Sequence, residues 1–306
     1  MDNKKLTDLT YSVLDLASVV EGKTIADTFN NSVILAQHVE NLGYTRYWFA
    51  EHHNMISVAS SATSVLIGHI AGKTEKIRVG SGGIMLPNHS PLIIAGQFGT
   101  LATLYPDRIG RAPGTDQLTA MEIRGGRVNM PHSFPQDVLK LQKYLSASNS
   151  GASVRAIPGE GTDVPLWILG SSTESAHLAA SYGLPYAFAT HFAPTYFMEA
   201  IQIYRQNFRP SAMLKEPYVM ACVNAVMADT DTEAEKLSTS LKQLFMGIVT
   251  GKRQLLQPPV DNMDDVWDVM QEEAVNQMLA VSFIGGSAKI KAQMQSFLNQ
   301  TGGNEV

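Results

Sequence analysis

Short apolar runs alternate with helix-like stretches along most of the chain, and this alternation limits the possible folds more than any other feature. The runs over residues 47–49 and 165–170 are almost wholly apolar, which is typical of strands buried on both faces. Stretches with apolar residues at helical spacing, such as residues 24–42, separate these runs. The pattern predicts parallel strands joined by crossover helices.

The expected elements follow one another in a regular order. We expect strands over residues 11–16, 47–49, 76–84, 105–109, 165–170, 185–190 and 218–228, and helices over residues 24–42, 60–73, 92–104, 134–145, 173–182, 195–208 and from 232 onward. Two architectures fit this order, a (β/α)₈ TIM barrel and a doubly wound open sheet. The first strand is not followed by the Gly-x-Gly-x-x-Gly turn of a dinucleotide fold, which disfavours the open sheet.

Two places count against a complete barrel. The fourth strand is short, because residues 105–109 run directly into Gly110-Arg111-Ala112-Pro113-Gly114. An eighth strand should follow a helix near residues 288–298, but the sequence reaches Val306 within a few residues. We therefore expect strand 4 to be shortened, and strand 8 with its helix to be missing. Our hypothesis is that these residues are absent from this sequence and are not evolved deletions.

The polar stretch over residues 246–276 also breaks the alternation. It carries Gln257-Pro258-Pro259 and several aspartates. A long polar segment within a compact domain is usually functional or mobile. We predict a mobile loop or lid over the barrel mouth within a single domain of residues 1–306, with a plain surface insertion as the alternative.

Composition excludes several classes of function. The 306 residues carry a net charge of −5 and no basic run, so we expect no nucleic-acid partner. The sequence shows no signal peptide and no membrane span. Cys222 is the only cysteine, which excludes disulfides within the chain and favours the cytoplasm. Its apolar surroundings, Val219-Met220-Ala221-Cys222-Val223, predict a buried core thiol.

The second strand ends in Glu51-His52-His53-Asn54, an abrupt change from apolar to polar residues. Adjacent side chains on a strand point in opposite directions, so His52 and His53 are not expected to share a metal ion. A single imidazole that faces a pocket and handles a proton is the better functional interpretation. A polar surface turn is the alternative.

Three further strand ends carry residues suited to a phosphate-bearing, planar ligand. Gly80-Ser81-Gly82-Gly83 would let a flat ligand approach the backbone, or would form an ordinary turn. Arg111 lies between glycines and suits an anion, although exposed loop arginines are common. Ser171 and Ser172 precede a helix whose N-terminus can bind an anion, or they cap that helix. In a barrel, all four strand ends lie on the active-site face.

Together these motifs resemble those of the bacterial-luciferase-like flavin monooxygenases (the LLM class), and the non-luminescent bacterial members most. The stretches that match are Ala50-Glu51-His52-His53-Asn54, Gly80 to Pro87, Gly110 to Asp116 and Leu169-Gly170-Ser171-Ser172, in the order of the family, and the resemblance runs from about Leu14 to the end. The resemblance implies a (β/α)₈ TIM barrel, usually a homodimer. It also implies reduced FMN from a separate flavin reductase and oxidation of a small organic substrate by O₂ through a flavin peroxide.

The resemblance also assigns roles to single residues. His52 matches the histidine that supports the flavin peroxide, and Glu51 matches the acidic residue beside it. Gly82 and Gly83 match small residues under the flavin ring that a cis non-proline peptide joins. Arg111 matches the phosphate-binding arginine. Ser171, Ser172 and Ser175 match the phosphate side of the helix start.

The sequence departs from the family at the two barrel gaps and at Gly96-Gln97-Phe98, where the family tends to have Glu-Gln-Phe. Two alternative functions remain open on the same fold. One is a flavin-binding protein without turnover, and the other is an oxidoreductase that uses a deazaflavin. The sequence does not name the substrate.

Overall fold

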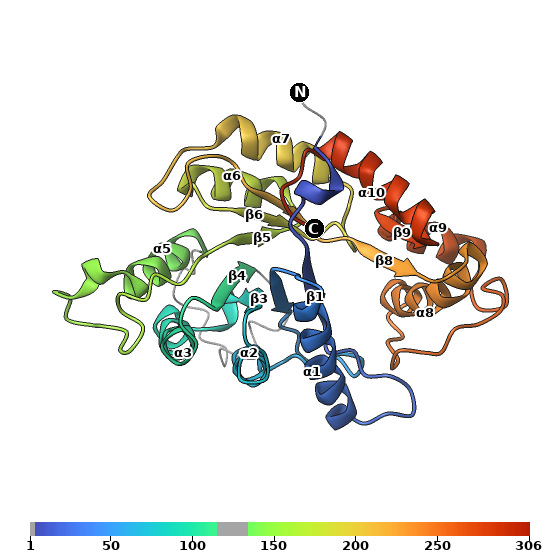
Figure 1. The fold of residues 1–306 in the computed structure, drawn as a ribbon, viewed down its shortest axis with the longest axis horizontal. Helices are drawn as coiled ribbons and strands as arrows, with labels where there is room; N and C mark the ends of the chain where they lie inside the picture. The colour runs from blue at the N-terminus through green and yellow to red at the C-terminus, as the bar shows by residue number, and fades with distance from the viewer. Residues whose placement is uncertain (1–3, 115–133) are drawn as a thin grey trace.

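The structure, a computed structural model, describes residues 4–114 and 134–306, with parallel strands inside and helices outside (Figure 1). The barrel strands are β1 (Ser12–Asp15), β2 (Arg46–Phe49), β3 (Arg78–Met85), β4 (Ile109–Gly114), β5 (Ile168–Gly170), β6 (Tyr186–Phe188) and β7 (Val219–Ala221). Strands β1 to β4 form one sheet and β5 to β7 another, and every neighbouring pair is parallel. Parallel neighbours agree with the predicted order of strands and crossover helices.

Hydrogen bonds join the first sheet to the second at the seam between β4 and β5. The N–H of Arg111 donates to the carbonyl of Pro165 at 3.3 Å, and the N–H of Trp167 donates to the carbonyl of Arg111 at 3.0 Å. The predicted shortening of strand 4 is wrong, because β4 spans Ile109–Gly114 and pairs with β3 along its length. The glycines and Pro113 that look like a turn in the sequence belong to this strand.

The last three residues, 304–306, fill the seam between β7 and β1. The N–H of Ala221 donates to the carbonyl of Glu305 at 3.0 Å, and the N–H of Ser12 donates to the carbonyl of Val306 at 2.8 Å. Glu305 is thus bridged in parallel to both neighbouring strands. No strand or helix follows α10 among the described residues, as expected, but residues 304–306 bridge the place where the eighth strand would lie, and the predicted TIM-barrel fold is confirmed. A segment this short carries no recognisable strand pattern.

Helices cover the outside of the barrel. They are α1 (Ile25–Asn41), α2 (Thr63–Ala71), α3 (Pro91–Leu104), α5 (Phe134–Leu145), α6 (Thr173–Tyr182), α7 (Phe197–Asn207) and α10 (Ser287–Thr301). Helix α1 begins as its sequence predicts, because the Thr24 side chain accepts from the N–H of Asp27 at 3.1 Å while Asp27 accepts from the N–H of Thr24 at 2.9 Å. The buried faces of these helices pack against the outer faces of the strands to form the main hydrophobic core.

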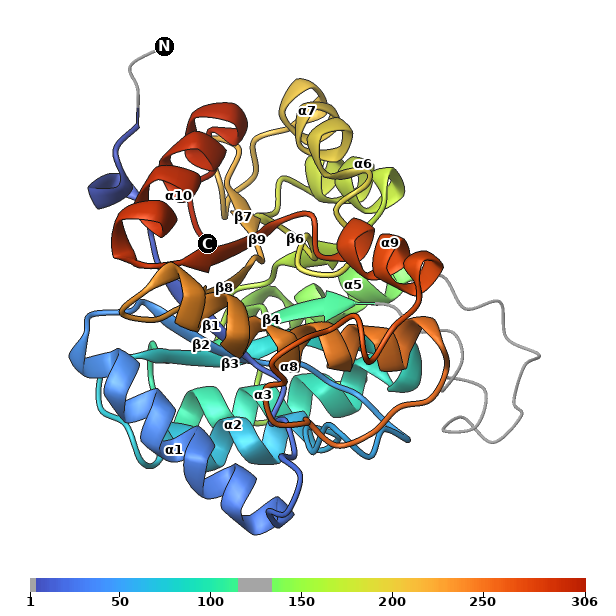
Figure 2. The same ribbon diagram turned by 90° about the vertical axis from the view of Figure 1, so that its right-hand side faces the viewer.

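The run over residues 218–228 is not one strand but two. It divides after β7, and β8 (Asn224–Met227) leaves the barrel to pair with β9 (Ser282–Gly285) (Figure 2). Helices α8 (Asp231–Val249) and α9 (Val269–Met278) connect β8 to β9. The predicted insertion over residues 246–276 therefore includes the end of α8, most of α9 and the loop between them.

The loop between α8 and α9 is anchored to the segment that follows β1. The N–H of Leu256 donates to the carbonyl of Val19 at 2.8 Å, and the N–H of Glu21 donates to the carbonyl of Leu256 at 2.9 Å. That residues 246–276 act as a mobile lid over the barrel mouth remains a prediction.

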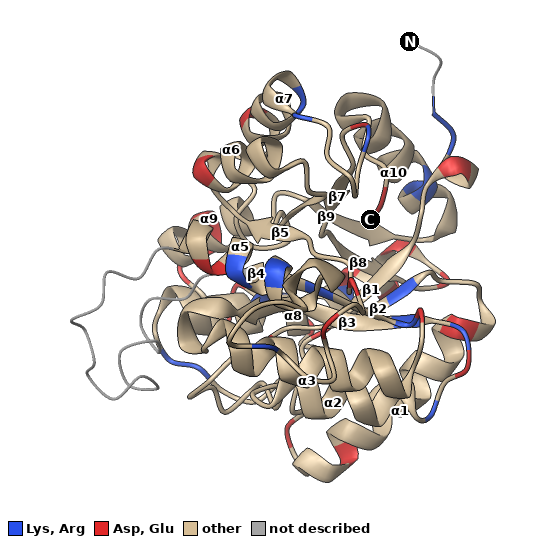
Figure 3. Ribbon diagram, turned by 90° about the vertical axis from the view of Figure 1, so that its left-hand side faces the viewer, with Lys and Arg blue, Asp and Glu red and all other residues tan. Residues whose placement is uncertain are grey.

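Charges are spread over the outer helices and loops, with acidic and basic residues interspersed (Figure 3). Among the helices of the described residues, none combines the length and the apolar character needed to cross a membrane.

Glu305 closes the barrel with its side chain as well as its backbone. The side chain is fully buried, and its carboxylate accepts hydrogen bonds from Arg46 at 2.5 Å, from the hydroxyl of Tyr218 at 2.9 Å and from Ser12. Burial raises the pKa of Glu305, while Arg46, Ser12 and Tyr218 act against that rise. When one partner of such a buried ion pair is removed, the charge of the other stays buried without an opposite charge to stabilise it.

We expect Glu305→Ala to lower the free energy of unfolding by about 3 kcal/mol or more, because Arg46 loses its buried partner. Urea unfolding followed by tryptophan fluorescence measures the change. The exposed pair of Lys236 and Asp261 provides the control, and Asp261→Ala should change stability far less. Equal effects of the two substitutions would contradict a closing role for Glu305.

Candidate active site

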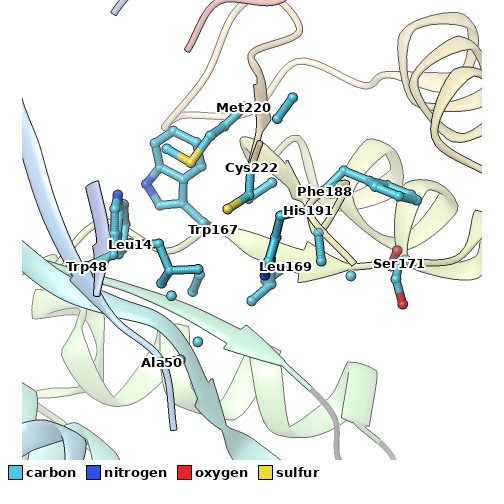
Figure 4. Close-up of a pocket in the computed structure, with 18 of the residues that line it drawn as sticks. Leu14, Trp48, Ala50, Trp167, Leu169, Ser171, Phe188, His191, Met220 and Cys222 are labelled. Carbon is cyan, nitrogen blue, oxygen red and sulfur yellow. The ribbon is translucent and has the colours of Figure 1, made fainter. Parts of the chain in front are cut away.

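A cavity of about 560 Å³ opens at the carboxyl ends of the barrel strands (Figure 4). Every strand from β1 to β7 contributes to its wall, either directly or through the residues that follow the strand. Parallel strands in a closed barrel all end on the same side, so residues far apart in the sequence meet there. This is the face on which the sequence places its four polar motifs.

Aromatic and aliphatic side chains fill the barrel beneath the cavity. The rings of Trp48 and Trp167 pack edge to face with centroids 5.8 Å apart, and Leu14, Ala112 and Met220 surround them. These side chains line the lower part of the cavity and make it apolar. A ligand in the cavity therefore meets an apolar surface from below.

Gly82 and Gly83 form one wall of the cavity and are joined by a cis peptide bond, as the resemblance implies. A Cβ at Gly82 would lie 3.1 Å from the Cβ of Trp48, closer than most such contacts. This wall is therefore bare backbone, and a flat ring can approach it closely.

Glu51 lies behind this wall and does not line the cavity. Its buried carboxylate receives hydrogen bonds from His53 at 2.7 Å, from His89 at 2.8 Å and from the N–H of Met85 at 2.7 Å. Burial acts to raise the pKa of Glu51, but the hydrogen bonds from His89, His53 and Met85 outweigh it and the pKa is lowered. Glu51 thus ties the residues after β2 to the turn after β3.

His52 lines the cavity, whereas its neighbour His53 turns away and contacts Glu51. Adjacent side chains diverge here as the sequence predicts. Within residues 4–114 and 134–306, no three His, Cys, Asp or Glu side chains are grouped so that they could hold a metal ion. The arrangement provides one imidazole facing the cavity and one that supports the wall.

Serines at the start of α6 form the other polar part of the cavity. Ser171, Ser172 and Ser175 all line it. Ser172 caps the helix by accepting from the N–H of Ser175 at 3.5 Å, and the Ser175 hydroxyl donates to the carbonyl of Ser172 at 2.7 Å. The N-terminal end of a helix attracts anions through its free N–H groups and its dipole.

Arg111 is not among the residues that line the cavity. Its neighbour Ala112 faces inward, so the side chain of Arg111 points outward and its guanidinium lies 6.0 Å from the ring of Phe98. The guanidinium is buried, its Nε and Nη1 have no partner among the described residues, and burial lowers its pKa to about 9. A buried cation without a partner is unusual and fits an anion site.

His191, which its place just past the sixth predicted strand makes a candidate for the pocket wall, lines the cavity, and so does Cys222. The thiol of Cys222 is buried, as expected, but it lines the cavity and is not part of the hydrophobic core, because β7 ends at Ala221 and Cys222 is the first residue beyond it. Burial raises the pKa of its thiol to about 12. His191 likewise lies in the segment that follows the end of β6. The position of Cys222 just after a strand end is the sequence signal that could have identified it as a cavity residue as well.

Comparison with known proteins shows the family to which the chain belongs. The profile of the luciferase-like monooxygenase family matches residues 10–305. The chain belongs to this family.

Proteins from two bacteria and one solved structure show how close the similarity is. The chain is 52% identical over its whole length to the protein YvbT of Bacillus subtilis strain 168, of which it covers 92%. It is 48% identical to the luciferase-like monooxygenase of Escherichia coli K12, with 98% of this chain and 92% of that protein covered. The crystal structure of apo-MsnO8 has a TM-score of 0.84 at 31% identity, covering 97% of this chain and 91% of that one.

More distant structures share the fold but differ in cofactor. The oxygenating constituent of 3,6-diketocamphane monooxygenase from Pseudomonas putida, in complex with FMN, has a TM-score of 0.71 at 14% identity, covering 98% of this chain and 91% of that one. The coenzyme F420 dependent tetrahydromethanopterin reductase from Methanopyrus kandleri has a TM-score of 0.70 at 14% identity, covering 98% and 92%. These likenesses show the fold alone.

Gly170 keeps the start of α6 in place. A Cβ at Gly170 would lie 2.4 Å from the Cβ of Ser175, so we expect Gly170→Ala to displace the helix start and to lower the free energy of unfolding by about 1–3 kcal/mol. Thermal and urea unfolding measure the change. Gly96 in α3 provides the control, because a Cβ there meets no described atom within 4 Å, and Gly96→Ala should be neutral or stabilising.

The stability of the protein should depend on pH through His191. Burial, with a smaller effect of His52, lowers the pKa of His191 from its ordinary 6.5 to about 4. Between these values the unfolded chain binds more protons than the folded one, so the free energy of unfolding falls as the pH decreases. In His191→Phe we expect a smaller difference between the free energies of unfolding measured at about pH 7 and about pH 5. An unchanged difference would contradict this expectation.

Proposed function

We propose that the protein is a flavin-dependent monooxygenase that uses reduced FMN and O₂ to oxidise a small organic substrate. The observation that carries this proposal is the cavity itself. It combines a bare glycine wall at Gly82 and Gly83, a facing imidazole at His52 and the N-terminus of α6. The glycine wall and the helix N-terminus suit a planar cofactor with one phosphate, the imidazole suits proton transfer beside it, and the chain belongs to a family of monooxygenases.

The residues of the cavity fit FMN in shape and charge. We propose that its ring lies against Gly82 and Gly83, which present no side chain. The phosphate is assigned to Ser171 and Ser172 at the start of α6. Arg111 on the neighbouring strand β4 is proposed to compensate the phosphate charge, since the Nε and Nη1 of its guanidinium have no partner among the described residues.

When bound, reduced FMN supplies the electron pair with which one atom of O₂ enters the substrate and the other leaves as water. The chain's own residues orient the reactants and exclude water. His52 is proposed to hold and transfer a proton at the reacting end of the cavity. Glu51 is proposed to act from behind the wall, because its carboxylate holds His53, His89 and the backbone of Met85.

The proposal extends to the partners of the enzyme. We propose a cytoplasmic homodimer that receives reduced FMN from a separate flavin reductase, and the single cysteine suits a reducing compartment. Exposed apolar residues on or next to neighbouring outer helices support self-association, namely Ile34 and Leu42 at α1, Val65 on α2, and Ile93 and Leu104 on α3. Sedimentation velocity measures the oligomeric state.

Anaerobic titration with reduced FMN, followed by mixing with O₂ in the presence of a substrate panel, tests the function. Stoichiometric binding and an oxygenated product support a monooxygenase. Binding without any product supports a flavin-binding protein without turnover. Tighter binding of a reduced deazaflavin than of reduced FMN supports the deazaflavin alternative, for which the F420-dependent relative in fold is the reason to test.

We expect His52→Ala to leave the affinity for reduced FMN within about threefold of the wild-type value, because backbone and serine groups are proposed to hold the cofactor. The proportion of flavin oxidation that yields product should fall by about 10²-fold, the typical contribution of a positioned acid or base. The ratio of product to hydrogen peroxide, measured after mixing with O₂, reports this coupling.

His69→Ala, an exposed substitution of the same type on α2, serves as the control and should leave the coupling unchanged. A coupling ratio in His52→Ala equal to that of wild type would contradict the proposed role.

A further inference from the structure

His191 follows β6 and lines the cavity on a different strand from the glycine pair, which belongs to β3. The backbone of His191 is held in place, since its carbonyl accepts a hydrogen bond from the Asn224 side chain at 2.7 Å. Its ring packs edge to face against Phe192, with centroids 4.8 Å apart and planes at 87°. The direction of the imidazole is therefore set by the protein before any ligand binds.

The ring of His191 lacks a hydrogen-bond partner within the part of the chain that the structure describes. Its Nδ1 is buried and unpaired there. Buried polar atoms in native proteins nearly always have a partner, and an exception needs an explanation, such as a water or a bound group that pairs with it. Because His191 lines the cavity, the missing partner is expected from a ligand in that cavity.

The surroundings of His191 define what kind of ligand this is. Figure 4 shows the residue among Leu169, Phe188 and Cys222, on the wall formed by β5, β6 and the end of β7. Of the described residues that line the cavity, Glu174 at the start of α6 is the only Asp, Glu, Lys or Arg. This wall offers apolar contacts and one hydrogen-bonding ring, but no charge to pair with an ion.

We propose that His191 is a substrate-binding residue that holds, by a hydrogen bond through its ring, the polar end of a small uncharged substrate with an apolar body. The assignment rests on the proposed monooxygenase function, because that proposal places the flavin ring at Gly82 and Gly83 and leaves His191 to the substrate. The titratable groups that line the same cavity are His52, Cys222 and Glu174. Burial and His52 both disfavour the charged form of His191, so at neutral pH one ring nitrogen donates and the other accepts.

Three probes of similar size test this specificity in the complex with oxidised FMN. They are cyclohexanone, which is uncharged and has one oxygen, methylcyclohexane, which lacks the oxygen, and cyclohexanecarboxylate, which is charged. Binding is measured by ligand-observed NMR. We expect wild type to bind cyclohexanone about three- to tenfold more tightly than methylcyclohexane, the effect of a single hydrogen bond, and to bind the carboxylate most weakly.

His191→Phe should abolish the preference for cyclohexanone, and His191→Gln, which keeps a hydrogen-bonding group, should restore part of it. His69→Phe, at an exposed position, serves as the matched control and should keep the preference. Nitrogen-15 NMR of the histidine rings adds a second readout, and cyclohexanone should shift the His191 ring signals of wild type.

The proposal is overturned if wild type shows no preference for cyclohexanone, if His191→Phe retains that preference, or if the carboxylate binds most tightly. Titration of the same wild-type sample with reduced FMN separates this failure from failure of the proposed function. Loss of flavin binding contradicts the monooxygenase proposal. Intact flavin binding with no effect of His191 contradicts only the substrate assignment.

Discussion

The hydrogen bonds that hold residues 304–306 between β7 and β1 are the constraint on which the rest of the structure depends. Without them the two sheets are joined only at the seam between β4 and β5, and β1 and β7 remain open edges. With them the strands form a ring, and all carboxyl ends lie around one mouth. This closure brings His52, the Gly82–Gly83 pair, Ser171 and His191 to one cavity, although they follow different strands.

Two buried carboxylates stabilise opposite ends of this barrel. Glu305 joins Arg46 and Tyr218 at the end where the strands begin. Glu51 joins His53 and His89 behind the cavity wall, where the strands end. Neither carboxylate lines the cavity, so both act on function through the position of other residues. A buried carboxylate is tolerated only with several partners, which is why each ties distant segments together.

Much of the fold and part of the site could be predicted from local patterns. The apolar strands and amphipathic helices identified the barrel order, and the polar residues after the strands identified His52 and the serines at α6. The fourth strand could not be recognised, because Gly110 and Pro113 favour a turn and become part of a strand only by pairing with β3. The closing segment at Glu305 was missed because it is too short to show any periodicity.

Placement of the remaining site residues could not be derived from local patterns either. Arg111 and Ala112 are neighbours, yet only Ala112 faces the cavity, because the register of β4 decides which side chain points inward. Cys222 has the surroundings of a core residue, but the end of β7 one residue earlier exposes it to the cavity. Only the folded structure shows that the ring of His191 has no partner among the described residues. This unpaired ring is the reason for assigning His191 to ligand binding.

The sequence by itself determined where strands and helices lie and which polar residues follow the strand ends, since these depend on spacing along the chain. The tertiary structure alone decided that the ring closes, which side chains face the cavity and which polar groups remain unpaired. These depend on contacts between segments such as β1 and residues 304–306, which are almost the whole chain apart. No local pattern in the sequence indicates such contacts, because they form, and stabilise the protein, only in the folded barrel.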